Sequence, residues 1–505
     1  MRFRNSRGAG SPLRLAALTA CATAVLISTE ACAPSRPVSA APRAPSALVQ
    51  LQHDIDGILS QPALAHGYWG VLVRSLNTND TLYTVNARKL MLPASNMKIV
   101  TLAAAAEKLG WDYTYETRLM ASGSNANGTL DGDLVVVGSG DPSMMDGGEG
   151  GTPPFDAWVA ELKRRGIERI GGRILGDDAA FESQGIGFGW SWDDLVDDYA
   201  SGASALQFNE NAVRVSVTPG PAVGDAAGVA AEPVTSGLAI RNDVRTGARD
   251  SAAHVETHRM PGSAELQLRG SVPAGGPPIV RAVSADNPTL FFVTALRHAL
   301  IAGGIDVRGP AVDIRDVPVR GARTPIASLR SAPLSTLAVR LMKISQNLYA
   351  ETLLATLSGT TPATAAGGRA VVASVLASWG IPDGEVIQRD GSGLTRYDYV
   401  TPEAVVEILT HVDRDPRLRG PFEASLPVAG RDGTFANRMK GTAAEGNVRA
   451  KTGSMTGVRA LSGYVTAADG EPLVFSIIVN NFDTPGAVVT SATAAIVVRL
   501  AAFKR

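Results

Sequence analysis

The chain has 505 residues, of which 45% are hydrophobic and 19% are charged, so it can bury a sizeable core and is not a disordered polymer. Its 47 basic and 48 acidic residues leave a formal net charge of −1, which gives no indication of a nucleic-acid partner. The length accommodates roughly two to four domains. Cys21 and Cys32 are the two cysteines, so the chain beyond residue 33 excludes disulfides, cysteine nucleophiles and cysteine-ligated zinc.

Residues 1–33 have the pattern of an export signal. Four arginines precede an uncharged apolar run over 15–27, which is shorter than the ~20 residues that a membrane span needs. Small residues flank Cys32 where a signal peptidase would cut. We therefore predict a signal peptide, a Pro/Ala/Ser-rich linker over 34–45, and a periplasmic, extracellular or cell-envelope location. Lipidation of Cys32 stays open as an alternative and would be the chain's link to a membrane.

Residues 46–110 combine helical patterns with a β-hairpin pattern. Apolar residues recur at helical spacing in two stretches, and two short β-like runs flank an Asn-rich turn. The predicted elements are a helix over 48–59 capped by Ser46, strands over 70–75 and 80–85, and a helix over 95–109 ended by Gly110.

Residues 111–326 differ in texture, with short β-like runs between Gly, Pro and Asp turns and few helical patterns. We predict an inserted, mostly β module with room for a second module nested inside it. His254, Glu256 and His258 would share one face of a strand, but no His-Glu-x-x-His helix pattern accompanies them, so we predict a solvent-facing strand and no metal. Residues 138–141 are followed by Pro142 instead of a helix, which favours a turn over a phosphate loop.

Residues 327–505 return to longer helical patterns and end in two strands and a helix. The predicted helices cover 335–357, 402–412 and 487–503, and the predicted strands cover 460–465 and 473–480.

Ser95 and Lys98 form the first chemical motif, at the start of a predicted helix. A serine hydroxyl is a poor nucleophile unless a base lies beside it, and residues three apart share a helix face. The helix N-terminus also favours negative charge on the serine oxygen. Chance alone gives such a Ser-x-x-Lys pattern about once in a chain of this length, so this motif indicates a catalytic site only if further motifs accompany it.

Two further motifs follow in the order that such a site requires. Ser345 and Asn347 interrupt the apolar pattern of the predicted helix over 335–357, where short polar residues are mediocre helix formers. Lys451 opens Lys-Thr-Gly before the strand at 460–465, where a glycine lets a substrate backbone lie against an edge strand. Each motif alone fits a solvated patch, but the three together predict a serine acyl-transfer site.

The three motifs resemble those of the serine penicillin-recognising enzymes, and longer matches narrow the resemblance to low-molecular-mass class C penicillin-binding proteins, the D-alanyl-D-alanine carboxypeptidase/endopeptidases. The resemblance runs from about residue 48 to the end of the chain and includes a very long gap between the first two motifs. It implies an α/β (α+β) fold: a transpeptidase/β-lactamase-like domain with a five-stranded antiparallel sheet, helices on both faces, and a large mostly-β insertion. The matching segments are 93–95, 345–351, 390–396, 426–433 and 450–454, with weaker likeness at 138–142 and 190–194.

The same resemblance implies a role for each motif residue. Ser95 would attack the carbonyl of the penultimate D-alanine, and Lys98 would take its proton. Ser345 would relay a proton to the leaving amine, Asn347 would bind the substrate amide, and Lys451 would set the local potential. Whether Lys98 or a Ser345–Lys451 pair is the working base stays open.

Further residues are implied for binding the substrate. Backbone N–H groups of Ser95 and Ser454 would form the oxyanion hole, while Thr452 and Gly453 would hold the terminal carboxylate and the substrate backbone. An acid from the insertion and an arginine would grip the ammonium and carboxylate of a diaminopimelate side chain. The residues in these roles are Asp194 and Arg396, with Met455 packing on the methylenes.

We therefore predict an enzyme without cofactor that acts on peptidoglycan stem peptides and cross-links and reacts covalently with β-lactams. One alternative is a β-lactamase, which shares the motifs but hydrolyses its acyl-enzyme quickly. It is disfavoured by the long insertion and by the lack of a short glutamate-bearing loop. The other is a non-catalytic peptidoglycan-binding protein of the same fold, disfavoured because all five motif side chains are present.

Overall fold

The computed structural model describes residues 46–145, 154–182, 185–318 and 321–505. The predicted signal peptide (1–33) and linker (34–45) lie outside these residues. No helix in the described ranges is long and apolar enough to cross a membrane.

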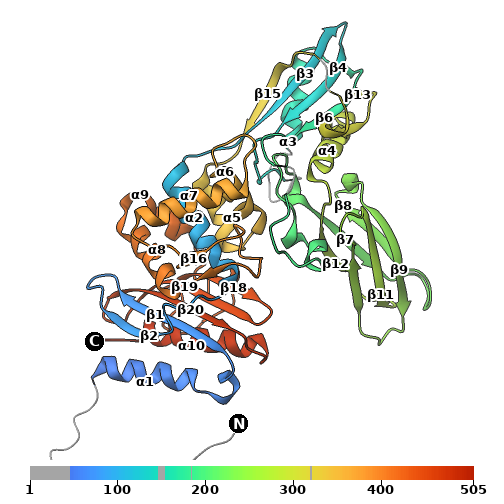
Figure 1. The fold of residues 1–505 in the computed structure, drawn as a ribbon. Helices are drawn as coiled ribbons and strands as arrows, with labels where there is room; N and C mark the ends of the chain where they lie inside the picture. Colours follow the sequence, from blue (N-terminus) through green and yellow to red (C-terminus); the bar gives the residue numbers. More distant parts are fainter. Residues whose placement is uncertain (1–45, 146–153, 183–184, 319–320) are drawn as a thin grey trace, which may run out of the picture. The chain divides into compact units, whose positions relative to one another are not determined.

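A five-stranded antiparallel sheet joins the first and last parts of the described chain (Figure 1). The predicted hairpin forms β1 (Tyr68–Ser75) and β2 (Thr81–Val85), and β1 pairs along its whole length with the late strand β20 (Pro472–Asn480). β19 (Val458–Thr466) and the edge strand β18 (Arg449–Met455) complete the order β18-β19-β20-β1-β2. The predicted hairpin and C-terminal strands are therefore confirmed.

Helices cover both faces of this sheet because its central strands bury side chains on both sides. On one face, Val71 and Phe475 pack with α1 (Ala47–Leu59) and α10 (Gly486–Ala501). On the other, Leu72 packs with a helical layer that contains the Ala-rich α2 (Met97–Leu109), which is buried from Met97 to Ala106. The other helices of this layer are α5 (Leu334–Lys343), α6 (Asn347–Thr356), α7 (Ala365–Ser378), α8 (Pro402–Arg414) and α9 (Pro416–Ser425).

The prediction of a single helix over 335–357 is wrong, because the structure has two helices there, α5 and α6, with non-helical residues between them. Ser345 has a left-handed backbone with φ of 65°, and the Gln346 side chain caps α6 by accepting from the N–H of Leu348. The apolar periodicity continues across the break, so it could not reveal it. Polar residues with short side chains favour such helix ends over helix interiors.

The inserted segment is mostly β, as predicted, and is closed by antiparallel pairing of its first and last strands. β3 (Glu116–Ala126) pairs with β4 (Thr129–Val137) and with β15 (Thr324–Arg330) in a seven-stranded sheet. Two three-stranded sheets are nested between. The remaining elements are β5 (Arg169–Ile170), β6 (Ile174–Asp177), β7 (Ala212–Thr218), β8 (Gly228–Glu232), β9 (Ala239–Gly247), β10 (His254–His258), β11 (Glu265–Pro273), β12 (Ile279–Ser284), β13 (Asp306–Val307), β14 (Ala311–Asp313), α3 (Pro154–Arg164) and α4 (Pro288–Ala302).

The two segments that resembled ligand sites form a strand, at 254–258, and an irregular loop, at 138–141. β10 is a strand on which His254 and Glu256 are exposed while Val255 between them is buried. Among the described residues, no three His, Cys, Asp or Glu side chains are grouped so as to hold a metal ion. Residues 138–141 follow β4 without helix or strand structure and lead into a turn at 142–143, where the Asp141 carboxylate accepts from the backbone N–H of Ser143 at 2.9 Å.

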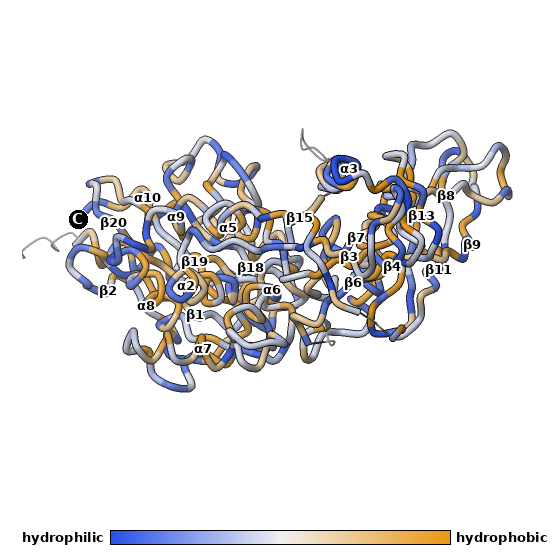
Figure 2. Tube along the Cα trace, turned by 90° about the horizontal axis from the view of Figure 1, so that it is seen from above, coloured by the Kyte–Doolittle hydropathy of each residue, from blue (hydrophilic) through white to orange (hydrophobic). Residues whose placement is uncertain are grey.

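An aromatic cluster fills the core of the insertion, and Figure 2 shows hydrophobic stretches along the inserted strands with hydrophilic residues in their loops. The Phe155 ring lies 5.1 Å from that of Phe208 and 5.3 Å from that of Phe292, centroid to centroid. Trp158 packs beside them from α3.

Phe292→Ala should lower the free energy of unfolding by about 3–5 kcal/mol, because Phe292 is fully buried and the cavity left behind adds to the lost transfer energy. Urea unfolding followed by circular dichroism measures the change. Val234, which is 86% exposed in the same insertion, provides the control: Val234→Ala should change stability by less than ~0.5 kcal/mol. Equal losses for the two variants would contradict this description of the core.

Candidate active site

Ser95 is held in a tight turn at the start of α2. It lies in the short helix η2 (Ala94–Asn96), just after Ala94, whose φ is 46°. Two glycines allow other segments of the same chain to pack closely against this turn. A Cβ atom on Gly393 would lie 1.9 Å from the carbonyl oxygen of Ala94, and one on Gly453 would lie 2.6 Å from that of Pro93. The Ser95 backbone is thus wedged between the Gly393 loop and strand β18.

Lys98, one turn further along, is fully buried and donates three hydrogen bonds. Its Nζ lies 3.0 Å from Ser95 Oγ, 2.6 Å from Asn347 Oδ1 and 2.8 Å from the carbonyl oxygen of Ser392. Burial lowers the pKa of Lys98 to about 7, although nearby carboxyl groups act in the opposite direction. A substantial fraction of this amine is therefore neutral near pH 7, beside a serine hydroxyl.

The break between α5 and α6 brings the second motif to the same place. Asn347 contacts Lys98 through Oδ1 and donates from Nδ2 to the carbonyl oxygen of Tyr199 at 2.8 Å. Ser345 Oγ accepts from Lys451 Nζ at 2.8 Å. Lys451 is also fully buried, and both desolvation and the charge of Lys98 lower its pKa well below the usual range. Two serine–lysine pairs thus lie together.

A cavity of 410 Å³ opens over these groups. Thr452 and Gly453 lie in β18 between Lys451 and Ser454, and Thr452 Oγ1 is 2.9 Å from Thr434 Oγ1. Lys98 and Lys451 are buried behind the cavity wall. The predicted site residues that line the cavity are Ser95, Asp194, Ser345, Asn347, Arg396, Ser454 and Met455.

Asp194 and Arg396, which were predicted to recognise a charged side chain, both line this cavity. Asp194 belongs to the insertion and Arg396 to the part of the chain that follows it. Asp194 begins the short helix η4 (Asp194–Val196) of the insertion, and its Oδ1 accepts from the Tyr199 hydroxyl at 2.8 Å. Arg396 is exposed and donates to the carbonyl oxygen of Thr456 at 3.3 Å. Asp193 lines the cavity as well. The cavity thus holds carboxylates and a guanidinium in reach of the same solvent space.

Sequence reasoning missed several groups that hold this site together. The Tyr199 carbonyl is a backbone group, which no side-chain motif reveals. Glu351 and Asp390 are buried acids near Lys98, and both fall inside segments that carried the family resemblance. Trp190, only 9% exposed, donates from its indole N–H to Asp390 Oδ2 at 2.9 Å and so ties the insertion to the catalytic loop.

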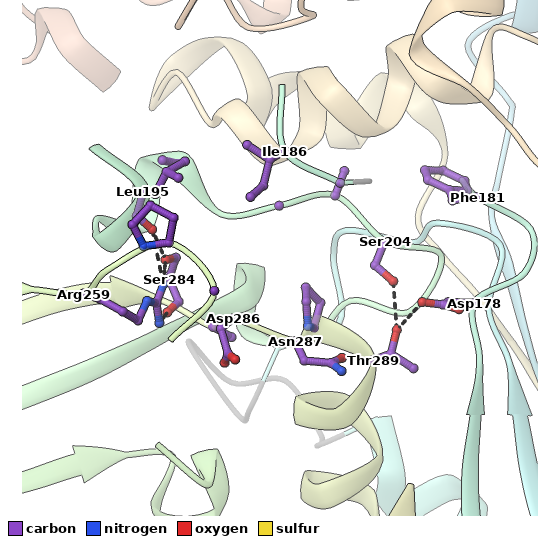
Figure 3. Close-up of a pocket in the computed structure, with 18 of the residues that line it drawn as sticks. Asp178, Phe181, Ile186, Leu195, Ser204, Arg259, Ser284, Asp286, Asn287 and Thr289 are labelled. Atoms are coloured by element: carbon purple, nitrogen blue, oxygen red, sulfur yellow. Dashed lines mark hydrogen bonds between the residues drawn. The ribbon is translucent and has the colours of Figure 1, made fainter. Parts of the chain in front are cut away.

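A second cavity, of 370 Å³, lies within the insertion and is shown in Figure 3. Its hydroxyl groups are engaged: Thr289 Oγ1 donates to Asp178 Oδ2 at 2.6 Å, and Ser204 Oγ lies 3.1 Å from Thr289 Oγ1. Arg315 contacts the same Asp178 oxygen at 3.2 Å. No lysine or histidine is among the described residues that line this cavity, so its serines, Ser204, Ser263 and Ser284, have no amine or imidazole base there.

Comparison with known proteins agrees with this geometry. Residues 51–503 match the D-Ala-D-Ala carboxypeptidase 3 (S13) family. The chain belongs to this family. A D-alanyl-D-alanine carboxypeptidase from an Actinomadura species is 35% identical over 470 residues, covering 90% of this chain and 85% of the relative.

A second family member and a solved structure support the same assignment. The D-alanyl-D-alanine carboxypeptidase DacB of Haemophilus influenzae is 28% identical over 421 residues, covering 82% of this chain and 86% of the relative. The crystal structure of penicillin binding protein 4 from Haemophilus influenzae aligns with a TM-score of 0.76 at 27% identity, covering 88% of this chain and 98% of that one. The predicted family, its penicillin-binding/β-lactamase-like fold with extra β sheets, and its serine-type D-Ala-D-Ala carboxypeptidase/endopeptidase activity are confirmed.

Trp190→Phe should destabilise this S13 carboxypeptidase by about 1.5–3 kcal/mol, because the buried Asp390 carboxylate loses a charge-assisted hydrogen bond. Thermal and urea unfolding measure the loss. Trp192→Phe is the matched control: Trp192 is 55% exposed, and its replacement should leave stability within ~0.5 kcal/mol of the parent. A Trp190→Phe variant as stable as the control would show that the indole contact contributes little.

Proposed function

We propose that Ser95 is the nucleophile with which this carboxypeptidase/endopeptidase opens D-alanyl-D-alanine and related bonds of peptidoglycan stem peptides and cross-links. The observation that supports this role best is the 3.0 Å contact between Ser95 Oγ and the buried amine of Lys98. A hydroxyl beside an amine whose pKa is near 7 meets the requirement for an activated nucleophile. The same contact favours Lys98 over the Ser345–Lys451 pair as the base for acylation.

Acylation begins when Lys98 takes the Ser95 proton and Oγ forms a bond to the carbonyl carbon of the penultimate D-alanine. The carbonyl oxygen becomes an oxyanion, which the backbone N–H groups of Ser95 and Ser454 stabilise. Each donor of this kind is typically worth about 3 kcal/mol. Thr452 and Gly453, on the edge strand β18, hold the substrate backbone and its terminal carboxylate.

The tetrahedral intermediate collapses when the carbon–nitrogen bond breaks and the leaving amine receives a proton. Ser345 relays to it the proton that Lys98 took from Ser95, and Lys451, with which Ser345 is in contact, sets the local potential. Asn347 Nδ2 has two hydrogens, so it can donate to Tyr199 and to a substrate carbonyl together. Water then attacks the acyl-enzyme, releasing the shortened peptide and returning a proton to Ser95.

β-Lactams acylate Ser95 in the same manner, because their strained amide presents a carbonyl to the same nucleophile. The structure of the Haemophilus influenzae protein in complex with a β-lactam, with a TM-score of 0.70 and 25% identity, supports this extension. Peptidoglycan lies outside the cytoplasm, which supports export by residues 1–33 to the periplasm or cell envelope. Lipidation of Cys32 is the alternative to a free N-terminus after processing.

The cavity beside Ser95 selects a side chain with two opposite charges, as in diaminopimelate. Asp194 pairs with the ammonium and Arg396 forms two parallel hydrogen bonds with the carboxylate, while Met455 packs on the methylenes. All three residues line the cavity that contains Ser95. The exposed position of Arg396 leaves its guanidinium accessible to a substrate.

Ser95→Ala should abolish both peptide hydrolysis and covalent labelling by a fluorescent penicillin, since the bond-forming oxygen is gone. Gel fluorescence and release of free D-alanine measure the two losses. Ser204→Ala, which removes a hydroxyl in the second cavity, should label to normal stoichiometry. Labelling of the Ser95→Ala protein would refute the assignment of the nucleophile.

Asp194→Ala combined with Arg396→Ala should remove a preference of about 2–4 kcal/mol for a peptide with a free diaminopimelate-type side chain over its uncharged aliphatic analogue. The reason is that each substrate charge loses its partner in a partly desolvated cavity. The ratio of kcat/KM values for the two peptides gives the preference. Asp193→Ala, a neighbouring acid of the same cavity, should retain it. Equal kcat/KM values of the parent enzyme for the two peptides would refute the proposed charged pocket.

A further inference from the structure

Helix α6 presents two residues, one turn apart, to the surroundings of Lys98. Asn347 contacts the Lys98 amine directly. Glu351, four residues on and only 7% exposed, accepts from the backbone N–H of Gly391 at 2.9 Å through Oε2 and from that of Ser392 at 2.8 Å through Oε1. The carbonyl oxygen of the same Ser392 accepts from Lys98. The backbone of one residue, Ser392, therefore connects the Glu351 carboxylate to the proposed base.

The loop that Glu351 grips is fixed from other sides as well. Asp390 accepts from the backbone N–H of Gly393 at 2.6 Å and from that of Thr395 at 2.7 Å. A Cβ on Gly391 would lie 2.4 Å from the carbonyl oxygen of Ala350, so the loop packs backbone to backbone on α6. The Ser392 carbonyl oxygen thus has a defined position relative to Lys98.

The position of that oxygen decides where the lone pair of Lys98 points. A neutral amine has two N–H bonds and one lone pair, whereas an ammonium has three N–H bonds and no lone pair. Asn347 Oδ1 and the Ser392 carbonyl oxygen are hydrogen-bond acceptors, so each of them must be contacted by an N–H bond of the Lys98 amine. When both contacts are made by the neutral amine, the lone pair is left facing Ser95 Oγ, the third partner.

We propose that Glu351 is a positioning residue for Lys98: its carboxylate fixes the Ser392 carbonyl that aims the amine at Ser95, and its charge acts on that amine. The inference rests on the proposed role of Lys98 as the base of acylation. Glu351 itself touches neither substrate nor the reacting atoms. It acts through the backbone of Ser392.

The charges around Lys98 give this proposal a measurable consequence. Asp390, Glu351 and Asp398 raise the pKa of Lys98 against the larger effect of burial, and the other buried cation nearby is Lys451. Burial and the Asp390 charge raise the pKa of Glu351, whereas the backbone N–H groups of Gly391 and Ser392 favour its charged form, and burial also raises the pKa of Asp398 well above its usual range. Removing the charge of Glu351 lowers the pKa of Lys98, so the base stays neutral to lower pH.

The test compares Glu351→Gln and Glu351→Asp in the rate of acylation by a labelled penicillin across pH. A glutamine amide turns an NH₂ group toward one of the two backbone N–H donors, so the Ser392 carbonyl shifts. Its plateau rate should fall by on the order of 10²-fold, the usual effect of a small misplacement of a catalytic group. The acidic limb of the profile, the pH range in which the rate falls as Lys98 becomes protonated, should move to lower pH. The non-covalent affinity for penicillin should stay near that of the parent.

Glu351→Asp separates position from charge, because it keeps a carboxylate on a shorter arm that cannot reach both N–H groups. Its rate should fall, while its acidic limb should lie closer to that of the parent than the limb of Glu351→Gln does. Asp178→Asn, at a buried acid in the second cavity, should leave rate and limb unchanged. A parent protein that penicillin does not acylate would refute the proposed function itself.

Two results would overturn the positioning role while leaving the proposed function intact. One is a Glu351→Gln protein with the parent's rate and acidic limb. The other is a variant with a lower Tm and lower rate but an unmoved limb, which a merely structural residue would give. If Glu351→Gln does not fold, Glu351→Asp decides, and a parent-like acylation rate in that variant would overturn the role.

Discussion

A fully buried lysine amine, that of Lys98, is the group around which the catalytic domain of this S13 carboxypeptidase is arranged. Removing an unpaired ammonium from water costs several kcal/mol, so such an amine must be partnered, neutralised or both. Its partners come from η2, α6 and the loop at Ser392, and the last two lie more than two hundred residues after Lys98. The helical layer brings these elements together, and burial there gives the amine the lowered pKa that serine activation needs.

The insertion contributes to the same centre and is more than an appended module. Its carbonyl at Tyr199 fixes Asn347, its Trp190 indole binds Asp390, and its Asp194 lines the cavity beside Ser95. Pairing of β3 with β15 closes the insertion on itself, so the chain leaves and returns at neighbouring points. A long insertion between the first two motifs is therefore compatible with their close contact in space.

Local patterns in the sequence predicted much of the fold, because caps, turns and alternation act over a few residues. The Ser46 cap, the hairpin turn and the strands that contain Val71 and Phe475 followed from such patterns. The left-handed Ser345 did not, since apolar spacing continues past it. The three motifs indicated which side chains form the site, but the support of Lys98 by backbone carbonyls and by Glu351 depends on tertiary packing that spacing does not encode.

The two buried lysines differ in what opposes their burial, and this difference gives the proposed proton path its direction. Carboxyl groups of Asp390, Glu351 and Asp398 favour a proton on Lys98, whereas the neighbouring charge that acts on Lys451 is the positive charge of Lys98 itself. Lys98 is thus the stronger base of the pair, which supports its proposed role in accepting the Ser95 proton. Once Lys98 is charged, its charge opposes a proton on Lys451, so the proton that Ser345 relays to the leaving amine is the one that Lys98 took. In this proposal Lys98 serves first as base and then as the source of the acid proton, while Lys451 acts on the Ser345 hydroxyl that it contacts.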